Sequence, residues 1–296
     1  MSTQPTLFAD DIPETDAPKI GAIAPWFGSK RNLAPRIVKA IGPHTAYWEP
    51  FCGSLAVLLA KPACTMETVN DLHGNLINLC RVLSREETAI SLYGNLSRLV
   101  MHEQLFIEAA ERVRIEWPNS APADTVPHVD RAADYMICSW FGRNGVSGTQ
   151  SYNQGFCARY TKNGGHAATR WVSAVESIPA WHARLRMVTI LQRDAFVLLE
   201  KIEDAAGVAI YCDPPYIVKG AKYVHDFAPA DHGRLAGLLH RFEKTRVVVS
   251  YYDDPLLGEL YPHWRMEKIE VTKALSLQNH KGAKPSKATE VLLMNF

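Results

Sequence analysis

One short stretch limits how this chain can fold more than any other. After the apolar run 207–210 the chain reads Tyr211, Cys212, Asp213, Pro214, Pro215 and Tyr216. A proline lacks an N–H group and has φ fixed at about −65°, so two prolines in a row cannot continue a central strand. The pattern therefore predicts a buried strand that ends at Asp213 and presents polar chemistry at its tip.

The groups at this tip suit a planar amine. The Asp213 carboxylate and the proline carbonyls, which no neighbouring strand can claim, accept hydrogen bonds, and Tyr216 offers a flat face. An amino group with two N–H bonds on a flat ring matches that set, and the exocyclic amine of adenine is one example. A buried strand followed by a plain proline turn is the alternative interpretation, so the surrounding sequence has to decide.

A first ligand-binding element is expected near the N-terminus. Trp26 and the pair Gly28-Ser29 precede apolar residues at helical spacing over 33–41, and we expect Gly28-Ser29 to form the turn and cap of that helix. Lys30 at such a helix start attracts anions through its charge and through the free N–H groups. A capped surface helix with a solvated lysine is the alternative.

Two further strand tips follow. The segment 45–49 reads as a strand ending at Glu49, and Pro50, Phe51 and Gly53 form a tight turn into the apolar helix 55–60. Such a strand, glycine turn and helix make a ligand cradle at the carboxyl end of a parallel sheet. The next strand, 64–69, leads to Asp71, which can accept hydrogen bonds from both hydroxyls of a ribose or can simply cap the next helix.

The middle of the chain is basic. Residues 85–117 carry the apolar pattern of one or two helices, and 132–140 predicts another. From 141 to 170 the chain is rich in polar residues and glycine, which is typical of a solvated loop. It also concentrates positive charge, because Glu176 is the single acid between 141 and 193. We therefore expect nucleic-acid contacts from side chains of this kind: Arg143, Asn144, Arg159, Lys162 and Arg170.

The rest of the chain returns to alternating strands and helices. We expect a helix over 171–186, a strand over 187–192, and Asp194 and Phe196 at the start of another helix. The helix 229–242, the strand 246–251 and a closing hairpin of 264–272 with 289–295 follow. Between the hairpin strands, Lys281 and Lys284 either contact phosphates or are solvated. The alternation predicts an α/β sheet with helices on both faces and an antiparallel edge.

Composition limits the kinds of surface, metal site and cellular location that can be expected. The 296 residues are 47% hydrophobic with a net charge of +1, so any basic surface has to be local. The six cysteines lie far apart, without the spacing of a zinc site, and we expect reduced thiols and no metal. No run reaches the roughly 20 apolar residues that span a bilayer, and no signal pattern opens the chain. A cytoplasmic protein, without membrane contact, is expected.

These motifs together resemble a known family. Asp213 to Tyr216 is similar to the Asp-Pro-Pro-Tyr motif of DNA methyltransferases that methylate amino groups, and Glu49 to Gly53 resembles the first S-adenosylmethionine motif. The order of the motifs over 20–296 resembles the Dam-like (D12 class) adenine-N6 methyltransferases. The resemblance implies a Rossmann-like α/β sheet with an inserted target-recognition subdomain. It also implies S-adenosylmethionine as methyl donor and site-specific transfer to adenine N6 in double-stranded DNA after base flipping.

The resemblance assigns roles to individual residues. The catalytic group is Asp213, Pro214, Pro215 and Tyr216. The cofactor-binding residues are Trp26, Lys30, Glu49, Pro50, Phe51, Gly53, Asp71, Asp194 and Phe196, with Asp194 accepting the amine of the cofactor's adenine. The predicted organisation is a disordered tail 1–19, a catalytic domain of 20–84 and 187–296, and a helical and loop insert 85–186. We expect a monomer or weak dimer in a bacterial or phage-infected cell.

Three positions depart from the pattern. The second glycine of the first cofactor motif is Leu55 here, which puts close backbone approach at that position in question. Pro25 and Ser151 differ from the members that read GATC, so that specificity is not transferred. Three alternatives stay open from the sequence: a cytosine-N4 methyltransferase, a methyltransferase acting on protein glutamine, and a DNA-binding protein of the same fold without catalysis.

Overall fold

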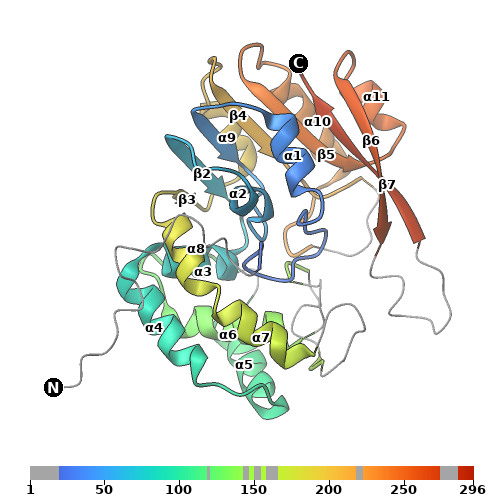
Figure 1. The fold of residues 1–296 in the computed structure, drawn as a ribbon. Helices are drawn as coiled ribbons and strands as arrows, with labels where there is room; N and C mark the ends of the chain where they lie inside the picture. Colours follow the sequence, from blue (N-terminus) through green and yellow to red (C-terminus); the bar gives the residue numbers. More distant parts are fainter. Residues whose placement is uncertain are drawn as a thin grey trace.

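A twisted, mostly parallel sheet organises the molecule (Figure 1). The computed structural model describes residues 20–118, 121–142, 147–149, 155–157, 166–217, 223–273 and 286–296. The strands are β1 (Ala46–Glu49), β2 (Met66–Asn70), β3 (Thr189–Leu191), β4 (Val208–Cys212), β5 (Arg246–Tyr252), β6 (Arg265–Lys273) and β7 (Ser286–Met294). Their spatial order is β3-β2-β1-β4-β5-β7-β6. The first five positions follow the order of doubly wound sheets, whose ligands bind where the order reverses, here between β1 and β4.

The pairing confirms the expected mostly parallel sheet with an antiparallel hairpin at one edge. β1 pairs in parallel with β2 and β4, and the pairs β2 with β3 and β4 with β5 are also parallel. β7 runs antiparallel to both β5 and β6, so the last strand of the chain enters between them. All strands from β1 to β5 therefore present their carboxyl ends at the same edge of the sheet.

Helices cover both faces of the sheet, as expected. The helices of the first face are α1 (Ala34–Ile41), α2 (Ala56–Ala60) and α3 (Gly74–Ser84). Those of the second face are α9 (Ala195–Lys201), α10 (Pro229–Leu239) and α11 (Leu256–Leu260). Side chains alternate across β5, so Val248 joins the core on the first face and Val247 the core on the second. This alternation explains why nearly every residue of β5 is buried.

Five helices between α3 and β3 gather on one side of the sheet, in the lower half of Figure 1. They are α4 (Glu86–Ser97), α5 (Glu103–Ile115), α6 (Val129–Phe141), α7 (Ala167–Val175) and α8 (Ile178–Leu185). Their apolar side chains, including Trp171 and Trp181, share one continuous core with the first face of the sheet. Arg184 of α8 also forms an ion pair with the buried Glu67 of β2. The predicted insert thus packs tightly against the sheet, and its boundaries at 85 and 186 remain a prediction.

Two local predictions were wrong. Gly28 does take a left-handed turn, with φ of 71°, but the first helix begins at Ala34 with Leu33 at its N-cap position, and Ser29 instead contacts Ser54 through their hydroxyls. The single helix expected over 171–186 is two helices, α7 and α8. Pro179 explains the break, because a proline cannot donate the helical hydrogen bond and its ring collides with the preceding turn.

Candidate active site

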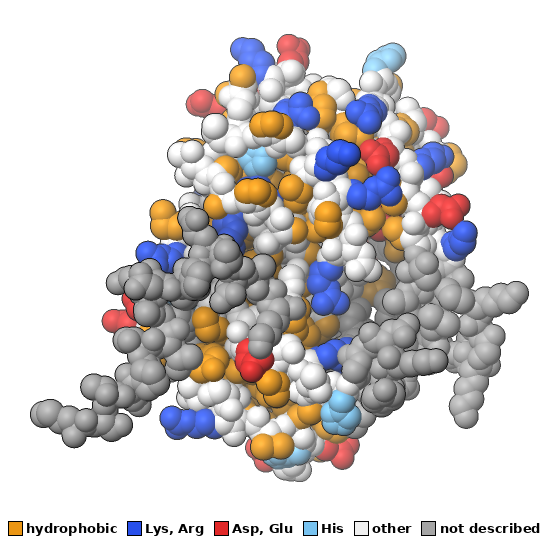
Figure 2. Space-filling view, viewed as in Figure 1, with side chains coloured by type: hydrophobic (Ala, Val, Ile, Leu, Met, Phe, Trp, Pro, Cys, Tyr) orange, Lys and Arg blue, Asp and Glu red, His pale blue; other side chains and the backbone are white. Residues whose placement is uncertain are grey.

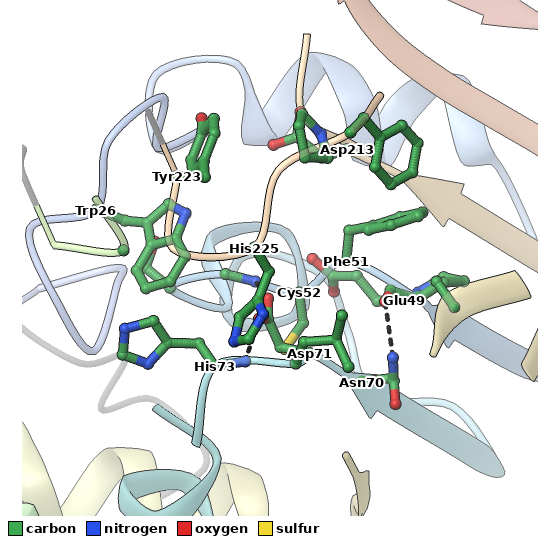
Figure 3. Close-up of a pocket in the computed structure, with 18 of the residues that line it drawn as sticks. Trp26, Glu49, Phe51, Cys52, Asn70, Asp71, His73, Asp213, Tyr223 and His225 are labelled. Atoms are coloured by element: carbon green, nitrogen blue, oxygen red, sulfur yellow. Dashed lines mark hydrogen bonds between the residues drawn. The ribbon is translucent and has the colours of Figure 1, made fainter. Parts of the chain in front are cut away.

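A cavity of about 250 Å³ lies at the carboxyl ends of the parallel strands (Figure 3). Four acids at the ends of strands line it: Glu49 is the last residue of β1, and Asp71, Asp194 and Asp213 follow β2, β3 and β4. The structure therefore brings together the strand tips that the sequence singled out. Of the predicted catalytic and cofactor-binding residues, all but Pro214 and Tyr216 line this cavity.

The glycine turn after β1 is tied to the tip of β2 by Asp71. One Asp71 oxygen accepts the backbone N–H of Gly53 at 3.0 Å and the other accepts that of His73 at 2.9 Å. Burial raises the pKa of Asp71, although these two backbone donors oppose the shift. The helix-capping role considered for Asp71 belongs to His73, whose ring accepts the N–H of Leu76. Asp71 thus presents a fixed, partly paired carboxylate to the cavity.

Trp26 lines the cavity, and its ring packs closely against the backbone of two glycines, Gly53 and Gly148. A Cβ atom on Gly53 would lie 2.9 Å from the Trp26 ring nitrogen, and one on Gly148 would lie 2.4 Å from Trp26 Cζ2. The ring also meets His73 edge-on, with centroids 5.5 Å apart. Burial lowers the pKa of His73 to about 3, so this neighbour is neutral. Gly148 lies in the predicted insert, and its close approach to Trp26 had no signal in the local sequence.

The β3 tip offers an aromatic slot. Asp194 is the N-cap of α9, where one of its oxygens accepts the N–H groups of Phe196 and Val197. Phe196 stacks on Phe227 at 5.5 Å, and Phe51 meets Phe227 edge-on at 5.6 Å. The sequence reasoning missed Phe227. These rings surround a space suited to a flat aromatic ligand, with the Asp194 carboxylate beside it.

Glu49 is buried, with 2% of its surface exposed, and accepts the hydroxyl of Tyr47 at 2.9 Å. Burial raises the pKa of Glu49 to about 8, and the nearby Asp213 carboxylate adds to the shift. The carboxyl is therefore mostly protonated at neutral pH and can donate a hydrogen bond into the cavity. Figure 3 shows Glu49 below Asp213 on the same side of the opening.

The Asp213 carboxylate is held from two sides. One oxygen accepts the hydroxyl of Ser250 at 2.9 Å, and Ser250 also contacts the Tyr211 hydroxyl at 2.9 Å. The other oxygen lies 2.9 Å from the ammonium nitrogen of Lys30. The sequence placed Lys30 in the cofactor site as an anion-attracting residue, and it does line the cavity, but its described charge partner is Asp213, the predicted catalytic acid. Ser250 was not predicted.

Tyr216 is anchored rather than free. Its hydroxyl donates to the Glu290 carboxylate at 2.7 Å, and only 9% of the residue is exposed. Tyr252 meets the ring edge-on at 4.7 Å, and the Lys30 ammonium lies 4.8 Å from the ring centroid. Burial raises the pKa of Tyr216, so the phenol remains a neutral donor. Glu290, on β7, had no signal in the sequence because its role depends on the hairpin reaching β5.

Most of the predicted DNA-contacting residues lie outside the described parts of the chain: Arg143, Asn144, Arg159, Lys162, Lys281 and Lys284. Arg170 is described, on α7, and its Nε atom is buried without a hydrogen-bond partner among the described residues. Burial lowers the pKa of Arg170, and the charge of Arg31 lowers it further. Figure 2 shows basic and acidic side chains mixed over the upper part of this face, consistent with the net charge of +1.

The sequence predicted neither a metal site nor a membrane-spanning helix. Among them, no three His, Cys, Asp or Glu side chains gather as a metal site. No helix in the same ranges is long and apolar enough to cross a membrane. All six cysteines are described and carry free thiols, four of them buried.

Comparison with known proteins adds an independent line of evidence. The profile of the D12 class N6 adenine-specific DNA methyltransferases matches residues 26–276. The type II methyltransferase M1.LlaDCHI of Lactococcus lactis subsp. cremoris is 28% identical over 284 residues, which cover 92% of this chain and 94% of that protein. The retron Ec67 DNA adenine methylase of Escherichia coli is 25% identical over 287 residues, which cover 93% and 92%.

A search of solved structures gave remote matches. The rRNA methyltransferase aviRa from Streptomyces viridochromogenes aligns with a TM-score of 0.42 and 12% identity, covering 97% of this chain and 96% of that one.

Proposed function

This protein belongs to the D12 class N6 adenine-specific DNA methyltransferases, and we propose that it moves a methyl group from S-adenosylmethionine to adenine N6 within a specific site of double-stranded DNA. Membership of the family gives the reaction class, methylation of adenine in DNA. One observation carries the finer proposal. The segment that follows β4 brings Asp213 and Pro215 to the same cavity that Glu49, Asp71 and Asp194 line.

The residues around the cavity fit S-adenosylmethionine. Asp71, fixed by two backbone donors, suits the ribose hydroxyls, and the rings of Phe51, Phe196 and Phe227 suit the adenine. His225 would add a polar contact to the cofactor, because its buried Nε2 atom lacks a hydrogen-bond partner among the described residues. When bound, the cofactor supplies a methyl group activated by its sulfonium.

Asp213 and Pro214 would act on the acceptor. The lone pair of adenine N6 is delocalised into the ring, so the nitrogen becomes a nucleophile only as its geometry moves toward tetrahedral. The Asp213 carboxylate and the Pro214 carbonyl accept its two N–H bonds and favour that geometry. They also stabilise the positive charge that grows on nitrogen, in a site preorganised by Ser250. This mechanism needs no general base, and alignment of the reacting atoms provides much of the remaining acceleration.

Access of the base requires a change in the DNA. Within a duplex the N6 amine cannot reach the end of β4, so we propose that the target adenine flips out of the stack, which costs roughly a few kcal/mol before protein contacts offset it. Arg170 and the predicted contacts outside the described residues would bind phosphates and base edges around the flipped site. The recognised sequence and the oligomeric state stay open, with a monomer or weak dimer as our expectation.

The test is transfer of labelled methyl from S-adenosylmethionine to unmethylated DNA, followed by sequencing of the modified positions. We expect wild-type protein to label DNA at one short sequence. Asp213→Asn, which keeps the shape but loses the charge, should reduce the rate by at least about a hundredfold. Asp253→Asn is the matched control, since Asp253 is exposed and pairs with Lys268. Label that survives Asp213→Asn would contradict the assigned role, and the absence of label on any DNA would contradict the proposal.

A further inference from the structure

The place of the Lys30 ammonium coincides with the place expected for the target amine. Its nitrogen lies 2.9 Å from an Asp213 oxygen and 4.8 Å from the centroid of the Tyr216 ring. The mechanism above places the N6 amine of adenine on Asp213, and the sequence analysis offers the flat face of Tyr216 to the base ring. A group of N–H donors over an aromatic face is also what Lys30 supplies. We propose that the Lys30 ammonium occupies the amine subsite in the enzyme without DNA, and that the target amine displaces it when the flipped base enters.

This inference rests on the proposed function and adds a residue to it. Lys30 was assigned to the cofactor by resemblance, whereas its contacts connect it to the acceptor side. The third contact of the ammonium is the Gly28 carbonyl, at 2.8 Å in its own loop. After displacement from Asp213, that carbonyl remains within reach of the flexible lysine side chain. Lys30 can therefore leave the subsite without losing every partner.

Burying the charged ammonium of Lys30 costs free energy unless nearby charges or hydrogen bonds compensate for it. Only 5% of Lys30 is exposed. Burial alone would lower the pKa of Lys30, but the charges of Asp213 and Glu290 more than reverse this, and its pKa is raised above the usual 10.5. The ammonium thus stays charged at all working pH values and has no lone pair, so it cannot itself accept the methyl group. A protonated lysine can therefore occupy this site without being methylated.

The ion pair between Lys30 and Asp213 lies among several other titratable groups. Carboxyls from two elements surround this pair: Glu49 at the end of β1 lies near Asp213, and Glu290 on β7 lies near Lys30. The tyrosines near it, Tyr211, Tyr216, Tyr223 and Tyr252, have pKa values raised by burial and are neutral. Lys30 is the cation in contact with this group of acids within the described structure. It occupies one oxygen of Asp213 until an amine donor arrives.

The direct test follows the Lys30 signal by NMR. The protein is labelled with 13C-lysine, and the Lys30 side-chain resonance is assigned by its loss in Lys30→Arg. Two duplexes are added with the cofactor product S-adenosylhomocysteine. One carries adenine in the methylated site, and the other carries purine, which lacks the amine. We expect the Lys30 resonance to shift with the adenine duplex and to stay near its free position with the purine duplex. Equal positions in both complexes would overturn the inference.

A binding test uses Lys30→Met, which keeps the length of the side chain and removes its charge. Without the ammonium, the target amine enters the subsite with no charged group to displace. The affinity for the adenine duplex, relative to that for the purine duplex, should rise at least about threefold over the wild-type ratio. Affinity for S-adenosylmethionine should stay within about threefold of wild type. Lys39→Met, on the exposed side of α1, is the matched control.

The outcomes separate the two proposals. If wild-type protein transfers no methyl to any DNA, the proposed function fails, and this inference fails with it. If transfer occurs but Lys30→Met keeps the wild-type ratio of the two duplex affinities, the inference alone is overturned. A variant that lost affinity for S-adenosylmethionine would return Lys30 to the cofactor site and would likewise contradict the displacement. The NMR comparison decides the question even where Lys30→Met folds poorly, since it uses the wild-type chain.

Discussion

At the scale of single residues, burial changes the chemistry of ordinary side chains around the cavity. Glu49 and Lys30 are both almost completely enclosed, yet the pKa of each is raised, for different reasons. Glu49 has too few positive neighbours to overcome its desolvation, and it holds its proton. Lys30 has Asp213 and Glu290 beside it, and it also holds its proton. The site therefore combines a neutral carboxyl at Glu49 with an ammonium at Lys30 that contacts Asp213.

The proton on Glu49 should make stability depend on pH. The pKa of Glu49 is about 8 in the folded protein, against an ordinary value of 4.5. Its contribution to the free energy of unfolding is thus complete below about pH 4.5 and is lost as the pH rises toward 8. We expect Glu49→Gln, which stays neutral, to gain on wild type by roughly 2 to 5 kcal/mol between pH 5 and pH 8. Urea unfolding at both pH values measures this. A constant difference between the two proteins would contradict the assignment.

Gly148 gives a second prediction at this scale. Gly148→Ala adds a methyl group 2.4 Å from Trp26, at a backbone φ of 84°, so the tryptophan has to move out of the cavity wall. We expect the affinity for S-adenosylmethionine, measured by calorimetry, to fall at least about tenfold. Gly155→Ala is the control, because nothing lies within 4 Å of an added Cβ there. Equal affinities of the two variants would show that the Trp26 wall does not contact the cofactor.

At the scale of elements, the start of α2 holds an unusual residue. Leu55 is its N-cap, with φ of 62°, and its side chain is completely buried. This is the position where the family resemblance expects glycine, and the backbone indeed takes the conformation that glycine favours. The chain accepts the strain of a left-handed leucine and gains a core side chain. The turn geometry is therefore kept although the glycine is absent.

Leu55 predicts an inverted order of stability. In most helix positions, alanine is more stable than glycine by about 1 kcal/mol. At position 55 both variants lose the buried side chain, which costs about 2 to 5 kcal/mol, but only glycine relieves the left-handed strain. We expect Leu55→Gly to be more stable than Leu55→Ala by about 1 kcal/mol in denaturant unfolding. The usual order, with alanine above glycine, would mean that the strained turn does not persist in solution.

The elements themselves were mostly predictable, and the failures have physical causes. The strand before Asp213 was evident because apolar residues run up to two prolines, and the hairpin of β6 and β7 was evident from its alternation. The break between α7 and α8 carried a signal, Pro179, that the apolar pattern outweighed. Ser29 resembled an N-cap, but α1 begins at Ala34, with a proline in its first turn. Local patterns thus locate elements more reliably than they locate the ends of elements.

At the scale of the whole molecule, the strand tips of the site were predictable but the contacts between distant segments were not. Parallel strands share one edge, so Glu49, Asp71, Asp194 and Asp213 had to converge. The hydrogen bond from Tyr216 to Glu290 joins positions 74 residues apart, and no sequence pattern near either residue predicts it. The approach of Lys30 to Asp213 likewise appears only in the folded chain. Such contacts depend on the whole fold, so no local pattern predicts them.

The balanced overall charge leads to a prediction about DNA binding. Arg170 lies beside Arg31 with both pKa values lowered by burial, an arrangement that a phosphate would stabilise. Arg170→Ala should weaken binding to all DNA sequences and reduce the slope of log affinity against log salt by about 0.9. Arg114→Ala, which breaks only an exposed pair with Glu111, is the control. An unchanged salt slope in fluorescence anisotropy would remove Arg170 from the DNA surface.

The central claim is that the end of β4 methylates the amine of adenine in DNA. It is tested most directly by incubating unmethylated DNA with the protein and S-adenosylmethionine, digesting the DNA to nucleosides and identifying them by mass spectrometry. The account predicts N6-methyladenine alone, absent when Asp213→Asn replaces the wild-type protein. N4-methylcytosine in its place, or N6-methyladenine formed equally by Asp213→Asn, would contradict it.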